Sequence, residues 1–576
     1  MVTPVRPVTV IRFGEFSAEL PTRRLFKRGV RVPLREKSFE LLVALLERPG
    51  EVVTREELRR RLWPEGVFVD FENNLNTVAA RLREALHEPA GRPRFIETVP
   101  RRGYRFTGTV AEPAGEREGG RIRLIVLPFL NLTGDPAQEY LSDSMTEELI
   151  AELAAAAPGR LAVIARTTAM CYKGATQDIA RIARSLAVDY AVESSLRRSG
   201  GRARLIVQLI RTSDQEHVWS QSYEAADEGL LAVKAAAAAD VARALGIRGP
   251  EKKGPASRDP VAYQRYLQGR YELNKWTREG LDRARPQFEE AVERDPEFAL
   301  AHDSLAELHW WEGFLGLTSP KEAFSKGVWP AMRALEIDSG LAETHALLGM
   351  YRKEISYDWR EVEREMAKAL ELNPASPVVR FRYALSGLMP SGRVREAAQE
   401  LERVLELDPL SVNVRMWLAE MLHFARENGR ALEQARILVE MDAGFWWGHM
   451  ALGQILLALG RLEEGFGALR QAASLSGGHP IILGWLGMAL GIAGEEREAR
   501  AMLEGLESAR GRVYIPPTSL AWIHLGLGET DEAFAWMDRA ADERDPILIP
   551  LKNYWFFDPL REHPRYRALL RRLNLA

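Results

Sequence analysis

The N-terminal part of the chain alternates between apolar positions spaced as in strands and apolar positions spaced as in helices. Two runs, VTVIRFGEFSAEL and RRLFKRGVRVPL, have the period of a strand and predict a small antiparallel sheet with a turn near Arg28-Gly29. A helix is expected from Glu36 to Glu47, before the stop at Pro49-Gly50. Its apolar face consists of Phe39, Leu42, Val43 and Leu46. These patterns predict a sheet followed by a helix.

Two more helices and a hairpin are expected after this first helix. Thr54 and Glu57 form a capping-box pattern that begins the second helix, and Trp63-Pro64 ends it. The third helix is expected near Asn73 to His87. Its inward face consists of Leu75, Val78, Ala79, Leu82 and Leu86. Its opposite face consists of Asn73, Asn74, Asn76, Thr77, Ala80, Arg81 and Arg83. The run PRFIETVPRRGYRFTG then predicts a hairpin with its tip at Pro100 to Gly103.

The order of these elements over residues 8–110 resembles the winged helix-turn-helix effector domain of the OmpR/PhoB family. The matching residues are Glu40-Leu41-Leu42, the LREAL run at 82–86 and the TVPRRGY run at 98–104. Arg35 departs from the family, which often has a Thr or Ser cap there. The resemblance implies a DNA-binding head whose third helix enters the major groove and whose hairpin is the wing. No phospho-receiver domain is recognised, so activation by an aspartyl phosphate in the same chain is not expected.

The third helix carries side chains that suit contacts with base edges. Asn pairs with adenine and Arg with guanine in the major groove, so we expect Asn74, Asn76 and Arg81 to read bases. Thr77 is expected to contact a thymine methyl group or a phosphate. The remaining polar members of this face are Asn73 and Arg83. The alternative is that the whole face is merely solvated surface.

The hairpin tip and the start of the second helix add candidate phosphate contacts. Arg101 and Arg102 at the tip are expected to enter the minor groove or bind phosphates. The helix N-terminus capped by Thr54 is expected to offer free amides to a phosphate. Charge agrees with this role, because residues 1–110 contain 21 Lys and Arg against 14 Asp and Glu, a net +7. The whole chain carries −3, so the remainder carries −10, and only the head is expected to meet a polyanion.

A second domain follows a short linker. Residues 111–121, AEPAGEREGGR, are rich in Pro, Gly and Glu and predict a flexible linker. Strand patterns then cover residues 123–129, 161–165, 190–197, 203–210 and 216–223, with a hairpin turn at Gly200-Gly201. Helix patterns cover residues 137–156, 178–186 and about 227–245. This order predicts an α/β domain over residues 122–247.

This domain is similar to the N-terminal domain of TolB, in the form that precedes tetratricopeptide repeats in bacterial regulators and some cyclases. The matching segments are residues 128–131, 140–143, 146–149, 172–174, 208–209 and Trp219. Ser144 stands where the family often has Gly. The resemblance implies no settled catalytic activity.

No catalytic, metal or cofactor site is expected in this domain. Asp143, Glu147 and Glu148 lie at a predicted helix N-terminus, where capping and the helix dipole explain them better than acid–base chemistry does. His217 has no second ligand at metal-binding spacing, and Cys171 is the only cysteine. The sequence contains no glycine-rich phosphate-binding motif. We therefore expect a protein that is not an enzyme.

Internal repetition dominates residues 255–576. Small residues recur every 34 positions, at Ala397, Ala431, Gly465, Ala499 and Ala533. Four positions after each of them stand Leu401, Ala435, Leu469, Leu503 and Met537. Helix-ending turns are expected at Asp295-Pro, Asn373-Pro and Asp408-Pro. This period resembles the tetratricopeptide repeat and predicts an all-α superhelix, with insertions near 320–360 and irregular units around 514–517 and 546–559.

A repeat superhelix has a concave groove that binds peptides or partner helices. The aromatic candidates for lining it are Trp310, Trp311, Trp446, Trp447, Tyr263 and Tyr266, although aromatics at helical spacing are more often core. Arg380, Arg382 and Arg415 would bind an acidic peptide there, or be solvated surface. The identity of the ligand is not encoded in these patterns.

The sequence thus predicts a multidomain transcriptional regulator with a winged-helix head, an α/β middle domain and a tetratricopeptide-repeat superhelix. Its expected partners are double-stranded DNA, bound by two copies on half-sites, and a protein such as RNA polymerase. The alternative is a repeat-based scaffold whose winged helix binds protein instead of DNA. The single cysteine and the lack of a signal sequence or of an apolar stretch of about 18 residues favour the cytoplasm, without a membrane span.

Overall fold

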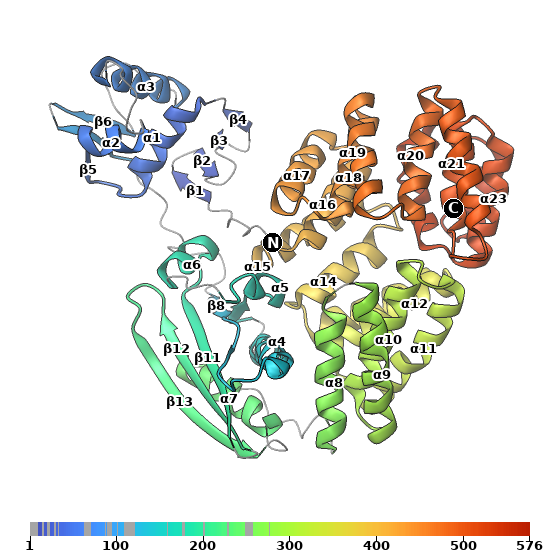
Figure 1. Cartoon of the computed structure of the whole chain (residues 1–576), viewed down its shortest axis with the longest axis horizontal. Helices are drawn as coiled ribbons and strands as arrows, with labels where there is room; N and C mark the ends of the chain where they lie inside the picture. Colours follow the sequence, from blue (N-terminus) through green and yellow to red (C-terminus); the bar gives the residue numbers. More distant parts are fainter. Residues whose placement is uncertain are drawn as a thin grey trace. The chain divides into compact units, whose positions relative to one another are not determined.

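The computed structural model describes most of the chain as two compact units (Figure 1). The described residues are 10–13, 16–19, 24–27, 30–32, 34–62, 71–86, 88, 95–100, 102–108, 121–157, 159–174, 179–199, 202–226, 230–247, 257, 259–275 and 277–576. One unit comprises Met1–Arg121 and Thr176–Asp189, which includes helix α6 (Ile179–Leu186). The other comprises Ile122–Ala175 and Tyr190–Ala576.

The head opens with the antiparallel sheet that the alternating pattern predicts. Its strands are β1 (Val10–Phe13), β2 (Phe16–Glu19), β3 (Arg24–Lys27) and β4 (Val30–Val32), paired in that order. Helix α1 (Glu36–Leu46) follows and begins where expected, although Arg35 offers no side-chain cap. The sequence predicted one apolar face on this helix, but Leu41, Ala44 and Leu45 outside that face are buried as well. Helix α1 is therefore the central core helix of the head.

Helices α2 (Arg55–Leu62) and α3 (Phe71–Ala85) are followed by the wing. All five inward residues predicted for α3 are buried. Strands β6 (Ile96–Val99) and β7 (Gly103–Phe106) form the predicted hairpin. Strand β5 (Val52–Thr54) was not predicted from the sequence, and it pairs with β7 as a third strand. A Cβ on Gly103 would stand 2.0 Å from the Val53 carbonyl oxygen, so only glycine allows this pairing.

The middle domain contains a mixed sheet with the order β10-β8-β11-β12-β13. Its strands are β8 (Ile122–Val126), β9 (Leu130–Asn131), β10 (Leu161–Val163), β11 (Tyr190–Ser199), β12 (Arg202–Arg211) and β13 (His217–Ala226). Strands β10, β8 and β11 run parallel, whereas β11, β12 and β13 form an antiparallel meander, and β9 pairs with β11. The helices are α4 (Glu139–Ala156), α5 (Arg166–Met170) and α7 (Leu230–Ala244). The predicted order of strands and helices along the chain is confirmed, with β9 and α5 as additions, although the helix predicted over 178–186 is α6, which belongs to the first unit.

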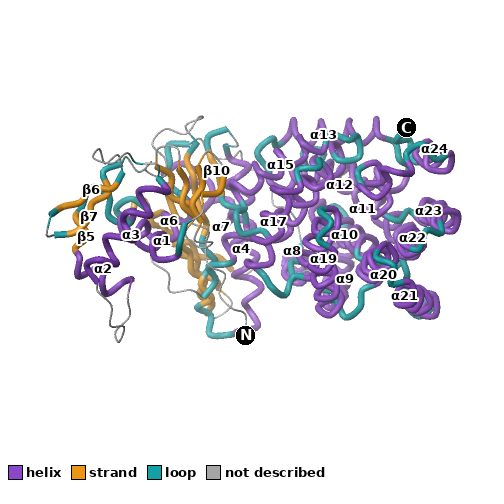
Figure 2. Tube along the Cα trace, turned by 90° about the horizontal axis from the view of Figure 1, so that it is seen from above, coloured by secondary structure: helices purple, strands orange, loops and turns teal. Residues whose placement is uncertain are grey.

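The rest of the chain is helical, and Figure 2 shows these helices beside the strands of the middle domain. The helices are α8 (Pro260–Leu273), α9 (Arg278–Arg294), α10 (Ala299–Phe314), α11 (Pro320–Ile337), α12 (Ala342–Ile355), α13 (Trp359–Leu372), α14 (Pro377–Tyr383), α15 (Val394–Leu407), α16 (Val412–Phe424), α17 (Asn428–Met441), α18 (Trp446–Ala458), α19 (Leu462–Leu475), α20 (Pro480–Ile492), α21 (Glu496–Ala509), α22 (Pro517–Gly526), α23 (Thr530–Glu543) and α24 (Pro564–Arg572). The residues of the predicted 34-residue period are buried where paired helices cross. The three expected Pro turns follow α9, α13 and α15.

The last irregular unit is a pair of 3-10 segments, η4 (Pro546–Lys552) and η5 (Trp555–Leu560). Prolines interrupt regular helix here because they lack a backbone N–H. The Asn553 amide donates to the Met389 carbonyl at 3.2 Å, and the Asn553 carbonyl accepts from Arg426 at 3.1 Å. The segment from 546 to 560 therefore packs across the array onto helices more than a hundred residues earlier in the chain.

Helix α4 corrects the expectation for the clustered carboxylates. Asp143, Glu147 and Glu148 lie inside α4, which begins at Glu139, so they are neither caps nor first-turn residues. Glu147 forms ion pairs with Arg270 at 2.7 Å and Arg166 at 3.2 Å. These acids are ion-pair and hydrogen-bond partners for residues outside α4.

Helix α8 supplies most of these partners. The hydroxyls of Tyr263 and Tyr266 donate to Glu148 at 3.4 and 3.2 Å. Both rings are buried, so they belong to the contact between the middle domain and the first repeat helix, and not to a groove. Their partners lie more than a hundred residues away, which local patterns do not reveal.

A second contact joins the middle domain to the turn between α15 and α16. The Thr168 amide and hydroxyl donate to the Asp408 carboxylate at 3.0 and 2.8 Å. The Ala165 amide donates to the Leu407 carbonyl at 2.8 Å. Burial raises the pKa of Asp408 to about 6, and these hydrogen bonds oppose that rise. The α/β domain thus contacts the repeats at two places that lie far apart in sequence.

Candidate nucleic-acid interface

Helix α3 presents the polar face that the sequence predicts. Its exposed members are Asn74, Asn76, Thr77, Ala80 and Arg81. The side chain of Asn73 lies outside the described part of the helix. The apolar stripe on the opposite side fixes which residues face outward, because it packs into the core of the head. The geometry therefore leaves one side of α3 available for contacts with another molecule.

Arg81 is the clearest candidate on this face. It is exposed and forms no ion pair or hydrogen bond with any described residue. An unpaired guanidinium loses no internal partner when it binds, and its planar donors suit guanine or phosphate. Its neighbour Ala80 is small and exposed, which leaves room beside it for a base pair.

Asn76 is held by two neighbours instead of pointing freely outward. Its Oδ1 accepts from the Tyr104 hydroxyl at 2.8 Å and from the Arg55 guanidinium at 3.3 Å. Bidentate reading of adenine needs this oxygen as an acceptor for the base. Asn76 would have to give up these bonds in order to read a base as predicted.

Arg83 was expected on the DNA-contacting face, and the structure corrects this. Its guanidinium donates to the Ile96 carbonyl at 2.9 and 3.2 Å and to the Thr98 hydroxyl at 2.6 Å. It also lies 5.8 Å from the centre of the Tyr104 ring. Arg83 therefore joins α3 to strand β6 of the wing.

The wing tip positions Arg102. Its amide donates to the Val99 carbonyl at 3.1 Å, and its carbonyl accepts from the Arg55 amide at 3.0 Å. The side chain is exposed and has no partner among the described residues. Arg101, the other predicted wing arginine, lies outside the described residues. The backbone bonds fix where Arg102 leaves the wing while its guanidinium stays accessible.

The N-terminus of α2 forms the predicted capping box but not the expected set of free amides. The Thr54 amide and hydroxyl donate to Glu57 Oε2 at 2.8 Å, and the Glu57 amide donates back to the Thr54 hydroxyl at 3.2 Å. These bonds, together with Arg48, lower the pKa of Glu57 to about 2. An ionised carboxylate at this terminus would repel a phosphate. Thr54 thus caps the helix, and its expected phosphate contact lacks the geometry.

Tyr104 is the organising residue that sequence reasoning passed over. It is buried, and its hydroxyl and ring lie against Asn76, Arg55 and Arg83. The ring connects α2, α3 and the wing in one cluster. The TVPRRGY run contains this residue, but the sequence does not show which side chains meet it.

The arginines predicted for the repeat groove have internal partners. Arg380 pairs with Glu400 at 2.5 Å. Arg382 is buried and pairs with Glu307 at 3.4 Å, and Arg415 donates to the Gln434 amide oxygen at 2.6 Å. These side chains stabilise contacts between repeats and are not available to hold an acidic peptide. Among the aromatic candidates, Trp310 and Trp447 do line a cavity of the array.

No helix in the described part of the chain is both long enough and apolar enough to cross a lipid bilayer.

Known families match three segments of the chain. Residues 29–106 match the family described as transcriptional regulatory protein, C terminal. Residues 121–237 match the second domain of HilA/YgeH-like transcriptional regulators, and residues 388–444 match a tetratricopeptide repeat.

Two relatives illustrate the likeness over longer stretches. A putative adenylate cyclase 3 of Rhizobium meliloti is 30% identical over 238 residues, which cover 39% of each chain. The transcriptional regulator HilA of Salmonella typhimurium is 25% identical over 383 residues, which cover 65% of this chain and 66% of HilA. The matched region spans less than two thirds of either relative.

A solved structure also resembles the head. The DNA-binding domain of RstA from Klebsiella pneumoniae, in complex with the RstA box, is 28% identical and covers 17% of this chain and 96% of that one, with a TM-score of 0.16. The family matches and the fold together show that this chain combines an OmpR/PhoB-type winged helix with a HilA-like second domain and tetratricopeptide repeats.

Proposed function

We propose that this protein is a sequence-specific transcriptional regulator that binds double-stranded DNA through α3 and the wing. The observation that carries the proposal is a pair of exposed arginines, Arg81 on α3 and Arg102 on the wing, neither of which has a partner among the described residues. They lie on a domain that matches the C-terminal family of transcriptional regulatory proteins. HilA, a relative along much of the chain, is itself named a transcriptional regulator.

The contacts divide the head residues into two roles. Arg81, Asn74 and Thr77 would face the bases and phosphates of the major groove. Arg102 would bind the minor groove or its phosphates. Asn73 and Arg101 remain proposed contacts on sequence grounds alone. Asn76, Arg83 and Thr54 would act by positioning: the first two hold α3 against the wing, and Thr54 fixes the start of α2.

The body of the protein would supply the regulatory input. We place the protein in the cytoplasm, with two copies on neighbouring half-sites and a protein partner such as RNA polymerase on the repeats. The middle domain, which we also regard as TolB-like, docks on the repeats through Glu147, which pairs with Arg270, and through Thr168, which donates to Asp408. Glu147 pairs with Arg270, and Asp143 pairs with Lys173 inside the middle domain, and these structural ion pairs support a regulator without catalytic activity.

A DNA-selection experiment with the full chain, followed by titration of the selected site, tests the proposal. Arg81→Ala is expected to weaken the selected site by roughly 1–3 kcal/mol and to relax one base position. Arg102→Ala is expected to weaken all sequences about equally and to reduce the dependence of affinity on salt. Both effects follow from removing a free guanidinium.

The matched control is Arg497→Ala, which removes one exposed arginine from α21 and should leave DNA affinity unchanged. Unaltered affinity in both head variants would overturn the assignment of this face. If the full chain and residues 1–110 select no DNA even at low salt, the head binds protein and the scaffold alternative takes its place.

A further inference from the structure

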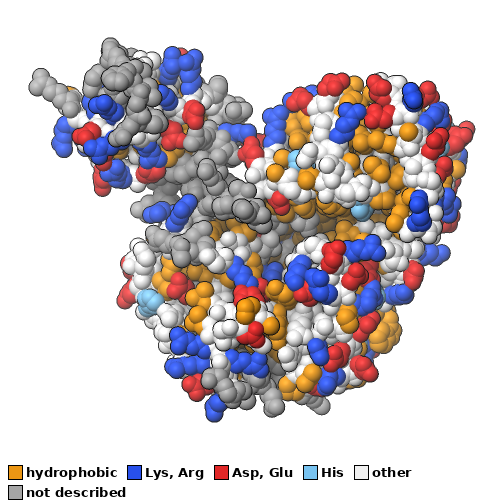
Figure 3. Space-filling view, in the orientation of Figure 1, with side chains coloured by type: hydrophobic (Ala, Val, Ile, Leu, Met, Phe, Trp, Pro, Cys, Tyr) orange, Lys and Arg blue, Asp and Glu red, His pale blue; other side chains and the backbone are white. Residues whose placement is uncertain are grey.

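The repeat array encloses a cavity whose chemistry differs from that of an ordinary core. It lies between helices α10, α12, α16, α18 and α20, and the segment of residues 546–554 closes it. The centres of water-sized molecules can occupy about 60 Å³ of this space. Figure 3 shows a hollow in the array with hydrophobic side chains along its border. We call this space the array cavity.

Aromatic rings form much of the wall of the array cavity. The rings are Trp310, Phe314, Trp417, Trp447, Trp485 and Tyr554. Phe314 stacks on Trp310 at 4.9 Å and on Trp447 at 6.0 Å between ring centres, and Trp485 meets Tyr554 edge-on at 5.6 Å. Such contacts hold the rings in fixed orientations before anything binds. Aromatic faces carry negative potential and attract cations.

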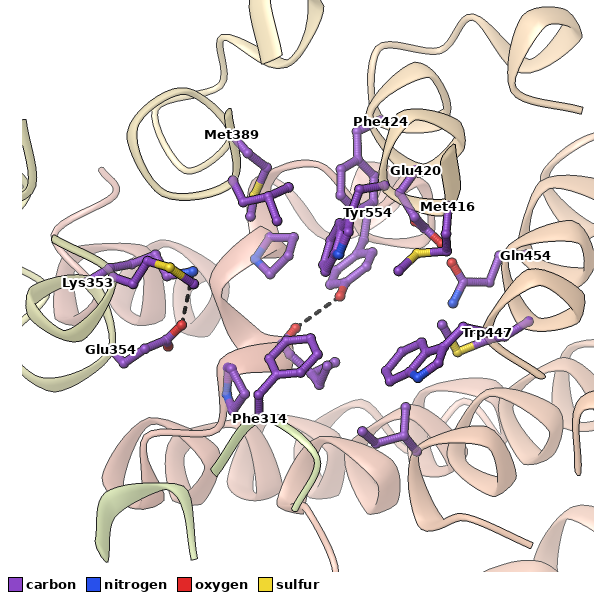
Figure 4. Close-up of a pocket in the computed structure, with 18 of the residues that line it drawn as sticks. Phe314, Lys353, Glu354, Met389, Met416, Glu420, Phe424, Trp447, Gln454 and Tyr554 are labelled. Carbon is purple, nitrogen blue, oxygen red and sulfur yellow. Dashed lines mark hydrogen bonds and ion pairs between the residues drawn. The ribbon is translucent and has the colours of Figure 1, made fainter. Parts of the chain in front are cut away.

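One carboxylate lies among these rings without a cationic partner. Glu420 on α16 is only 5% exposed, and it forms no ion pair with any described residue. In Figure 4 it lies beside Met416 and Gln454 at the edge of the cavity. With the Gln454 oxygen facing the Trp485 indole N–H at 3.2 Å, the Gln454 amide donates to Glu420 Oε1 at 3.0 Å. A single neutral hydrogen bond does not compensate a buried negative charge.

Glu420 is a buried carboxyl without a positively charged partner among the described residues, and its pKa reflects this. Burial raises the pKa of this carboxyl to about 8, so it is mostly neutral at pH 7. The other charged groups of the cavity are Lys353 and Glu354, which pair with each other at 2.9 Å. The Tyr554 hydroxyl donates to the Ile547 carbonyl at 3.0 Å, and burial raises the pKa of this phenol well above its usual value. None of these groups supplies a positive charge to Glu420.

We propose that the array cavity binds a small organic cation, a substituted ammonium with an apolar body, whose charge pairs with Glu420 between the tryptophan faces. The rings would contact the apolar body and the ammonium carbons, and Glu420 would ionise to meet the positive charge. A neutral ligand would leave Glu420 protonated and could gain only a hydrogen bond from it, and an anion would meet only Lys353, which Glu354 already neutralises. The proposal concerns binding alone and does not depend on DNA recognition by the head.

Calorimetric titration of the full chain with benzyltrimethylammonium chloride tests the proposal. This cation keeps its charge at every pH, so the ligand itself does not titrate. We expect saturable binding at one site, and weaker binding of benzyl alcohol and of 3-phenylpropanoate by roughly tenfold or more. Equal binding of benzyl alcohol, or no saturable binding of the cation, would overturn the proposal.

Glu420→Gln removes the charge and nearly preserves the shape of the side chain. The variant should bind the cation roughly ten- to a hundredfold more weakly and benzyl alcohol as before. The matched control is Glu504→Gln, an exposed glutamate on α21, which should change neither affinity. Undiminished cation binding by Glu420→Gln contradicts the assigned partner.

Proton release provides a measurement on the unaltered protein, so the test holds even if Glu420→Gln folds poorly. Because the pKa of Glu420 is about 8 in the free protein, pairing with a cation at pH 7 must expel close to one proton. Titrations in buffers of different ionisation enthalpy count that proton. Affinity should also rise roughly tenfold per pH unit below pH 8 and level off above it. Binding without proton release and without this pH dependence rules out Glu420 as the counter-charge.

Discussion

At the scale of single residues, the head depends on side chains that hold in place the ones we propose to contact DNA. Tyr104 contacts Asn76 through its hydroxyl and lies beside the guanidinium groups of Arg55 and Arg83. A polar hydroxyl buried in this way is hydrogen-bonded because an unpaired one would cost free energy. Arg81 and Arg102, which have no partner among the described residues, lie close to members of this cluster in the chain, two residues from Arg83 and Tyr104 respectively. In this domain, one set of side chains therefore holds α3 and the wing in place, and a different set is proposed to contact DNA.

Tyr104→Phe tests the positioning role. Loss of the hydroxyl removes the 2.8 Å bond to Asn76, which should weaken the attachment of α3 by about 1 kcal/mol. Hydrogen exchange of the peptide that covers residues 71–86 should then be about fivefold faster, and DNA affinity should fall modestly. The control is Tyr271→Phe on α8, which belongs to the other unit. Unchanged exchange in α3 would show that the hydroxyl does not hold the helix.

At the scale of elements, α4 and α8 are joined by charge and not only by apolar contact. Arg270 is enclosed by Glu147 and Glu307, with both ion pairs at 2.7 Å. The guanidinium keeps the pKa of both carboxyls below its usual value although burial opposes this. Removing one member of such a network leaves a buried charge uncompensated. This helix pair is therefore specified by its polar partners as well as by its shape.

A double-mutant cycle on Arg270 and Glu147 tests how strongly this ion pair stabilises the folded body. Arg270→Gln should destabilise the folded body by roughly 2–4 kcal/mol, because two partly buried carboxylates lose their cation. Glu147→Gln should cost less, since Arg270 keeps Glu307, and the double variant should be milder than the sum of the two. Chemical denaturation followed by circular dichroism gives these values. Strict additivity would mean that the two side chains do not interact.

At the scale of the whole repeat-containing unit, the middle domain contacts the array in two places. One contact is α4 on α8, and the other is Thr168 on the turn at Asp408. The first repeat helix and the turn after α15 are thereby linked through one rigid sheet domain. A change in the curvature of the array would have to break one of these contacts. The buried Asp408 makes the second contact sensitive to acidity.

The stability of the body should accordingly depend on pH through Asp408. Its folded-state pKa of about 6 lies above the usual 3.8, so the native state binds the extra proton. Stability from this group is fully present below pH 3.8 and is lost as pH rises through 6, by about 3 kcal/mol in total. Asp408→Asn should remove this part of the pH dependence. The check is the difference in melting temperature between wild type and Asp408→Asn at pH 5 and pH 7, which should not be constant.

The sequence by itself determined the features that depend on local spacing. Propensities and apolar positions a few residues apart predicted the 34-residue period, the inward stripe of α3 and the capping box at Thr54. They also predicted the succession of strands and helices along the middle domain. The tertiary structure alone decided which polar side chains remain free. Arg83 and Arg81 are two positions apart on one helix, yet one is bound to the wing and the other is open. Glu147, Arg382 and Glu420 acquire their roles from residues that the fold brings near them, and no local pattern encodes such distant neighbours.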